Sequence, residues 1–299
     1  MSARVSLSRV ELIPPQRQML WGWPAVVNFV LGGLGAGWYA IALLAAGLER
    51  SPAVTVASWA APALVLAGFA AVASEAGRPL RGLRVLTRVR TSWMSRELAL
   101  GGTFVLLVVL DLALRLWWCR AVALVAALLL AVAQGFILRR ARGVPAWDVP
   151  LMPTVFLLSA LLSGGGAWLA MEALGGHPIG PWRLGALLAL VVMGFAAWTR
   201  YLNWSSDRVF VRAVAPLQER RAAAAIEQFG YAVPLVLGLL ALAVPGAAVP
   251  LLALAGLSLI AGQVNAKTRL ILLVGQLRPI TLDIELRDRS DAQRDGERR

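Results

Sequence analysis

Eight apolar stretches, each long enough or nearly long enough to cross a lipid bilayer, follow one another along the 299 residues of this chain. One crossing by a helix takes about 20 mostly apolar residues. Hydrophobic residues make up 59% of the sequence and charged residues only 15%, a composition that excludes an ordinary soluble domain. The sequence therefore predicts an all-α integral membrane protein with eight transmembrane helices, at residues 22–47, 54–74, 98–117, 121–138, 150–171, 183–201, 230–247 and 249–265.

The positive charges are distributed very unevenly across these predicted spans. Of the 29 Lys and Arg residues, 25 fall on the side that holds both termini, and only Arg50, Arg115, Arg120 and Arg183 fall on the other side. Cytoplasmic loops are the ones enriched in Lys and Arg. We therefore expect both termini to be cytoplasmic, in a multi-pass protein of the cell inner membrane. The expected parts are a cytoplasmic N-terminal segment at 1–21, an anchor domain at 22–266 and a basic, partly disordered tail at 267–299.

Charge and metal-ligating residues exclude several classes of function. The net charge of +13 does not indicate nucleic-acid binding, because the arginines sit at helix ends, where they orient the chain and meet anionic lipid. Cys119 is the one cysteine, so we expect no disulfide within the chain, and we expect its thiol to pack at a helix end. His177 is the one histidine, whereas a haem held between two imidazoles needs two. We expect no haem and no metal in this chain.

Small and aromatic residues predict how the helices pack. Gly33 and Gly37 form a small-xxx-small pair that lets helices approach closely, and residues 164–166 are expected to do the same. The twelve Trp residues, Trp117, Trp147 and Trp182 among them, are interpreted as an interfacial belt. Polar and apolar residues alternate over 279–286 with the period of a strand. Such a strand either adds to the sheet edge of a partner or lies along the membrane surface.

Acidic residues at membrane depth are candidates for function because they are costly there. Asp111 and Arg115, four residues apart, are expected to neutralise each other on one helix face. Glu172 ends the fifth span near the far interface. Glu75 and Glu97 bracket the most basic loop and are both expected at the cytoplasmic boundary, where a carboxylate can exchange protons with water. Spacing alone leaves open whether these two acids transfer protons or pair with neighbouring arginines to hold the loop.

The loop itself resembles a known family. Glu75-Ala-Gly-Arg-Pro-Leu-Arg81, followed by Ser92-Trp-Met-Ser-Arg-Glu97, is similar to the membrane anchor of dimethyl sulfoxide reductase, within the wider group of NrfD-type and polysulfide reductase membrane subunits. Further matching stretches lie at 144–147, 248–252 and 261–263, so the resemblance covers most of residues 20–275.

The resemblance implies a membrane anchor and quinone-reacting subunit of a molybdopterin/iron–sulfur oxidoreductase. Its partners would be a four-cluster iron–sulfur subunit and a molybdopterin catalytic subunit, both on the cytoplasmic side, and its quinone would be ubiquinone or menaquinone. Glu97 matches an acid linked to quinol chemistry, whereas Glu75 stands where the family has a histidine. Gln263 and Lys267 stand where the family has Glu and Arg.

The site hypothesis gives each loop residue a role. Glu75 and Glu97 would transfer protons, Arg78, Arg81 and Arg96 would hold the loop and donate hydrogen bonds to a quinone carbonyl, and Trp93 would stack on the quinone ring. These residues would also dock the iron–sulfur subunit. Two alternatives stay open: a purely structural anchor without a quinone site, and a small-molecule transporter.

The N-terminal stretch 9–15 adds a refinement. It is similar to the membrane subunit of phenylacetyl-CoA:acceptor oxidoreductase. A coenzyme A thioester is a cytosolic substrate, which agrees with the expected orientation.

Overall fold

A computed structural model describes residues 6–19, 21–75 and 88–286. Eight helices or helix runs in this part of the chain are long and apolar enough to span a membrane, as the sequence predicts. Six of them are the helices α1 (Trp23–Ala45), α2 (Pro52–Glu75), α3 (Trp93–Leu114), α4 (Trp117–Arg139), α5 (Met152–Leu174) and α6 (Pro181–Leu202).

The last two spans are composite. The seventh is α8 (Arg220–Glu227), a π-helical turn η2 (Gln228–Ala232) and α9 (Val233–Ala243); the eighth is the short helix η3 (Pro245–Ala247) with α10 (Ala248–Leu272). α7 (Arg208–Gln218) connects α6 to this part and buries one side, centred on Phe210 and Leu217. The chain is an all-α integral membrane protein with eight spans, which confirms the predicted fold class.

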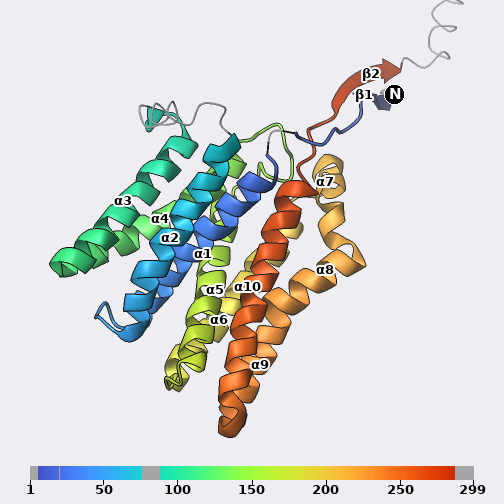
Figure 1. The fold of residues 1–299 in the computed structure, drawn as a ribbon. Coiled ribbons are helices and arrows are strands. Elements are labelled where there is room, and N and C mark those ends of the chain that lie inside the picture. Colours follow the sequence, from blue (N-terminus) through green and yellow to red (C-terminus); the bar gives the residue numbers. More distant parts are fainter. Residues whose placement is uncertain (1–5, 20, 76–87, 287–299) are drawn as a thin grey trace, which may run out of the picture.

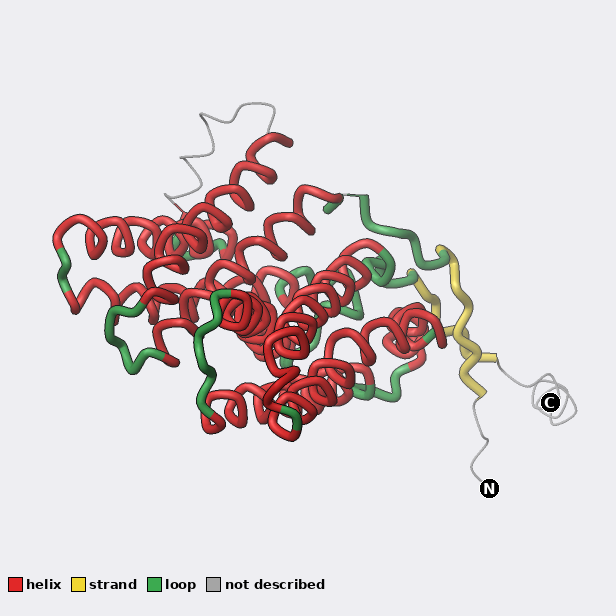
Figure 2. Tube along the Cα trace, turned by 60° about the horizontal axis from the view of Figure 1, so that its bottom comes forward, coloured by secondary structure: helices red, strands yellow, loops and turns green. Residues whose placement is uncertain are grey.

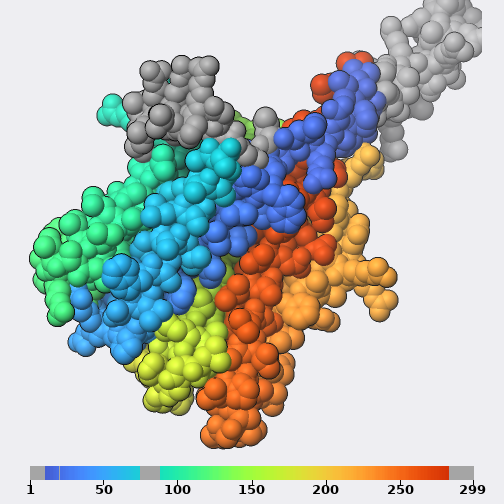
Figure 3. Space-filling view, in the orientation of Figure 1, coloured from blue at the N-terminus to red at the C-terminus, as the bar shows by residue number. Residues whose placement is uncertain are grey.

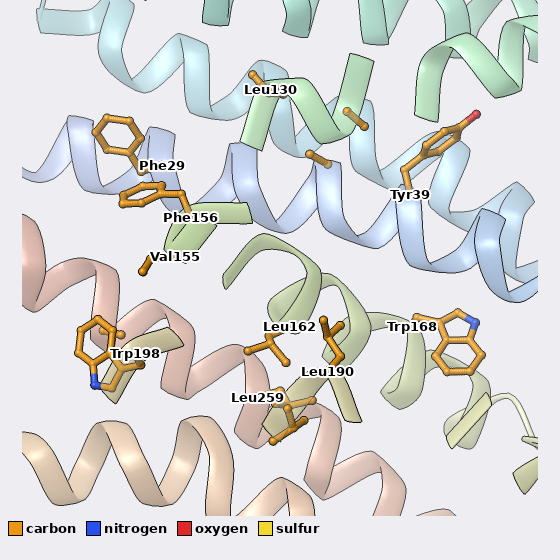
Figure 4. Packing of buried hydrophobic residues seen from close by; sticks show 14 of the residues in the cluster. Phe29, Tyr39, Leu130, Val155, Phe156, Leu162, Trp168, Leu190, Trp198 and Leu259 are labelled. Atoms are coloured by element: carbon orange, nitrogen blue, oxygen red, sulfur yellow. The ribbon is translucent and has the colours of Figure 1, made fainter. Parts of the chain in front are cut away.

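The bundle is built around α1 and α5, which cross at glycines. A Cβ atom on Gly164 would lie 2.5 Å from the carbonyl oxygen of Gly37, and a Cβ on Gly37 would strike the backbone of Ala160. This contact confirms the close approach predicted for both glycine segments. Apolar side chains fill the space around it: Figure 4 shows Phe29 of α1 beside Phe156 of α5, whose ring centroids lie 5.6 Å apart, edge to face.

α3 begins earlier than the sequence predicts. Ser92 caps the helix by accepting a hydrogen bond from the Ser95 backbone N–H. The helix therefore starts at Trp93 and not at 98. Its first residues include Ser95, Arg96 and Glu97, which are polar, so a search for apolar stretches does not include them in the span. As a result Trp93, Arg96 and Glu97 belong to a helix and have fixed directions on it.

Two short strands stand outside the helices. β1 (Ser6–Ile13) pairs with β2 (Ile280–Leu286) in an antiparallel ribbon that projects beyond the ends of the helices (Figures 1 and 2). The predicted strand at 279–286 is therefore present, but it pairs with the N-terminal segment of its own chain. We call the bundle end that carries the ribbon the terminal face, and the other end the opposite face.

Asp111 is paired differently from the prediction. Its carboxylate accepts a 2.9 Å hydrogen bond from Arg50 and lies 3.4 Å from the Arg120 Nε atom. Arg115 is exposed and has a left-handed backbone with φ 56°, so it ends α3 and turns away. The predicted Asp111–Arg115 pair is wrong, because the helix does not continue far enough to place the two side chains on one face.

Trp147 also departs from the prediction. Trp117 and Trp182 are exposed at the opposite face, as belt residues would be, but Trp147 is 2% exposed. Its indole N–H donates to the Leu270 carbonyl and its ring stacks on Trp21. Trp147 therefore ties the loop before α5 to α10. Cys119 is fully buried in the first turn of α4, as expected.

Candidate functional site

Glu97 points into the bundle. It lies in the second turn of α3 and is 6% exposed. One carboxylate oxygen, Oε1, accepts a 2.9 Å hydrogen bond from the Asn28 side-chain amide of α1 and a 3.1 Å bond from the Gln134 amide of α4. An ionisable group at this depth is costly unless it is hydrogen-bonded, and it marks a functional candidate. Glu97 is thus held by two neutral donors from two other helices.

The two amides leave acceptor atoms free beside Glu97. Gln134 Nε2 also reaches the Asn28 carbonyl at 3.4 Å. Asn28 Oδ1 and Gln134 Oε1 are buried and have no hydrogen-bond partner among the described residues. Buried acceptors are normally satisfied by a donor or an ordered water. The cluster can therefore receive a further donor, such as water or a proton carrier.

Lys267 brings a buried amine close to this cluster. It is 4% exposed, and its Nζ atom donates a 3.0 Å hydrogen bond to the Phe29 carbonyl. A Cβ on Gly33 would strike the Lys267 Nζ atom and would lie 3.5 Å from Gln134 Oε1. A Cβ on Gly32 would lie 2.5 Å from Gln134 Nε2. Because Gly32 and Gly33 have no side chains, the Gln134 and Lys267 side chains can occupy the space beside α1 and approach each other.

We call Asn28, Glu97, Gln134 and Lys267 the buried polar cluster. Its members come from α1, α3, α4 and α10, so it crosses the bundle. Beyond Lys267 lies a narrow pocket between α5, α6, η2 and α10, walled by apolar side chains and by Tyr231, Gln263 and Ser159. Gln263 Nε2 and Ser159 Oγ are buried without a hydrogen-bond partner in the described part of the chain. Gln263 and Lys267, two of the three departures that the family resemblance implies, thus lie on one side of α10 facing this pocket.

A larger pocket opens on the terminal face at the start of α3. It has a volume of about 480 Å³ and is lined by the following residues: Trp21, Arg90, Thr91, Ser92, Trp93, Met94, Arg96, Ile137, Arg140 and Ala141. Three arginines and two indoles give it cationic donors together with flat apolar surfaces. A planar headgroup with carbonyl acceptors fits these properties.

Trp93 and Arg96 are packed against each other within this pocket. The Trp93 ring stacks on the Phe136 ring with centroids 4.1 Å apart. The Arg96 guanidinium lies over the Trp93 ring, 4.3 Å from its centroid. Arg96 also donates to the carbonyls of Val89 and Arg90, which fixes the end of the loop. In this arrangement Trp93 offers its edge to a ligand, because other groups already occupy its faces.

The structure therefore brings part of the predicted site together. Trp93 and Arg96 line one pocket, and Glu97 follows them on the inner side of the same helix. Glu75 is the last residue of α2, and its side chain is not described. Arg78 and Arg81 lie outside the described residues.

Three members of the buried polar cluster were given no role in the sequence-based hypothesis. Asn28 and Gln134 are single amides within the otherwise apolar first and fourth spans, and that isolation was the available signal. Lys267 was assigned to the start of the tail, but α10 continues to Leu272 and buries it. Within the described residues, no group of three or more His, Cys, Asp or Glu side chains is placed to hold a metal ion.

Comparison with known proteins agrees with this architecture. The protein-family model described as DMSO reductase anchor subunit (DmsC) matches residues 18–268. This range includes all eight spans apart from the last turn of α10. No individual curated protein matches the sequence. Because the match covers well over half of the chain, the protein belongs to the DMSO reductase anchor subunit (DmsC) family and is a membrane anchor subunit of a molybdoenzyme complex.

Proposed function

We propose that this anchor passes electrons between a docked iron–sulfur subunit and the quinone pool, and that Glu97 transfers protons for the reaction. The observation that carries the proposal is the position of Glu97: a buried carboxylate, held by two amides, that follows Arg96 on α3 one turn after Trp93, and both of these residues line the terminal-face pocket. The family supports the existence of catalytic and iron–sulfur partners.

The chemistry requires both electrons and protons. Reduction of one quinone to quinol takes two electrons, which the partner's clusters would supply, and two protons, which this chain would deliver. Oxidation of quinol is the reverse. A positioned side chain that transfers a proton typically contributes about 10²–10⁴-fold to a rate. The Glu97 carboxylate would take each of the two protons in turn from the terminal face and pass it to the quinone, which ends with one proton on each oxygen.

The arginines of the terminal-face pocket would hold the headgroup. Arg90, Arg96 and Arg140 line it, and a guanidinium donates strong hydrogen bonds to an oxygen that gains negative charge. Arg96 is already fixed by two backbone carbonyls, so it can orient a quinone oxygen with little loss of side-chain freedom. Glu75, the last residue of α2, stays in the proposal as a second acid that transfers protons, and Arg78 and Arg81 stay as loop residues that donate to the quinone.

The terminal face is proposed to be cytoplasmic, with the soluble partners docked there. The excess of Lys and Arg on that side supports this orientation. The likeness of residues 9–15 to the phenylacetyl-CoA:acceptor oxidoreductase subunit supports a coenzyme A thioester as the substrate of the catalytic partner. Oxidation of phenylacetyl-CoA by the purified complex, with reduction of an added quinone, tests that refinement.

The decisive test compares two buried acids. Glu97→Gln should lower quinone turnover at least a hundredfold while molybdenum and iron still co-purify with the anchor. Glu172→Gln is the matched control, because Glu172 is also buried but lies at the opposite face beside His177, and we expect it to turn over normally. Normal turnover in Glu97→Gln, with full assembly, would favour a purely structural anchor. An anchor recovered without molybdenum and iron would favour a transporter.

A further inference from the structure

The ribbon of β1 and β2 lies outside the part of the chain that the family shares. β1 ends at Ile13 and β2 begins at Ile280, whereas the family match runs from 18 to 268. The two strands come from opposite ends of the chain and pair over seven positions, from Ser6 with Leu286 to Ile13 with Ile280. The family function of spanning the membrane does not account for this element.

The ribbon is fastened to the bundle at its base. Arg212 of α7 contacts both carboxylate oxygens of Glu11, at 3.1 and 3.2 Å. Backbone hydrogen bonds join Leu277 to Gln16, Gln18 to Gly275, and Arg278 to Gly143. The ribbon is therefore held in a defined direction by α7, by the loop before α5 and by the end of α10. Figure 3 shows the N-terminal segment lying against the C-terminal one at this base.

Beyond its base the ribbon has no partner among the described residues. A sheet of two strands is at best marginally stable alone, and each of its strands has an unpaired edge. The register puts Ile13, Ile280 and Leu282 on one face, because Ile13 pairs with Ile280 and alternate residues share a face. These side chains are 43%, 55% and 50% exposed. An apolar face and an open edge that project from the terminal face are suited to bind another protein.

The charge of the ribbon distinguishes a protein from a membrane surface. Its two strands contain one arginine, Arg9, and three acids, Glu11, Asp283 and Glu285, so the ribbon is acidic in a chain whose net charge is +13. Anionic lipid attracts basic segments and repels acidic ones. The ribbon also extends away from the helix ends, beyond the region that the spans cross (Figure 1).

We propose that the β1–β2 ribbon is a docking arm that adds its edge, and its apolar face, to a strand of a soluble partner subunit of the complex. Strand addition supplies backbone hydrogen bonds, and the alternate apolar side chains supply specificity. The inference rests on the proposed function only in that such a partner exists on the terminal face. It assigns to the terminal ribbon a role that the helical site does not have.

The test uses the intact complex from native membranes, with a photoreactive benzoylphenylalanine in place of Leu12 or Leu282. Both positions are at least half exposed on the ribbon. The control places the same residue at Leu174, which is 71% exposed at the opposite face. We expect a covalent adduct with a soluble subunit from both ribbon positions and none from Leu174. In parallel, Ile280→Asp with Leu282→Asp should lower the retention of soluble subunits about tenfold, and Leu174→Asp should not.

The outcomes separate the two proposals. Soluble subunits that co-purify while the ribbon yields no protein adduct, or adducts with lipid alone, would overturn the docking arm and leave the proposed function intact. An anchor that never retains a soluble subunit would overturn both.

Discussion

The Glu97 carboxylate and the Gln134 side-chain amide lie 3.1 Å apart inside the bundle, although 37 residues separate them in the chain. Gln134 thereby joins a buried acid on α3 to the space beside Lys267 on α10. Two amides from two other helices thus hold the buried acid in place inside the bundle.

Removal of the Gln134 donor should therefore impair turnover. Gln134→Met keeps a similar volume but leaves Glu97 with one donor, from Asn28. A hydrogen bond to a charged group is worth about 1.5–3 kcal/mol, so we expect turnover to fall about tenfold or more while the complex assembles. Quinone-linked turnover per molybdenum measures the effect. Ser58→Ala, which alters a buried hydroxyl bonded only to its own helix, is the control. Equal rates in the two variants would remove Gln134 from the site.

The crossing of α1 and α5 should not tolerate a methyl group. Gly37→Ala would place a Cβ against the backbone of Ala160, which cannot move without separating the helices. Overpacking of this kind typically costs about 1–3 kcal/mol, so the midpoint of thermal unfolding in detergent should fall by several degrees. Gly102→Ala should leave that midpoint unchanged or raise it, because nothing lies within 4 Å of a Cβ there.

Asp111 should be worth far more to stability than Arg115. Asp111→Asn would leave the Arg120 guanidinium, whose side chain is 11% exposed, without its negative partner. Breaking a buried pair on one side costs about 3–5 kcal/mol. Arg115→Ala should have no measurable effect, since that side chain is exposed at the helix end. Thermal unfolding of the two variants decides the matter, and a large loss in Arg115→Ala would restore the pairing predicted from sequence.

Surface labelling should establish the orientation of the chain. Cys119 is fully buried, so a cysteine introduced elsewhere is the reactive one. In intact spheroplasts, a membrane-impermeant maleimide should label Gly246→Cys on the opposite face and should not label Ser205→Cys on the terminal face. The reverse pattern would place the partner subunits outside the cytoplasm and contradict the coenzyme A thioester proposal.

The sequence by itself determined which segments cross the membrane, because a run of about 20 apolar residues can satisfy its backbone in lipid only as a helix. It also indicated Glu97, Trp93 and Arg96 as candidates, and the close approach at Gly37. It did not determine which side chains meet. Asp111 pairs with Arg50 and Arg120, not with Arg115, because the chain turns at a left-handed residue just after α3. The partners of Glu97 come from α1 and α4, and the strand at 280–286 pairs with residues 6–13. Tertiary structure decided these pairings, because buried polar groups bond to whatever packing brings within 3 Å, and spacing along the chain does not carry that information.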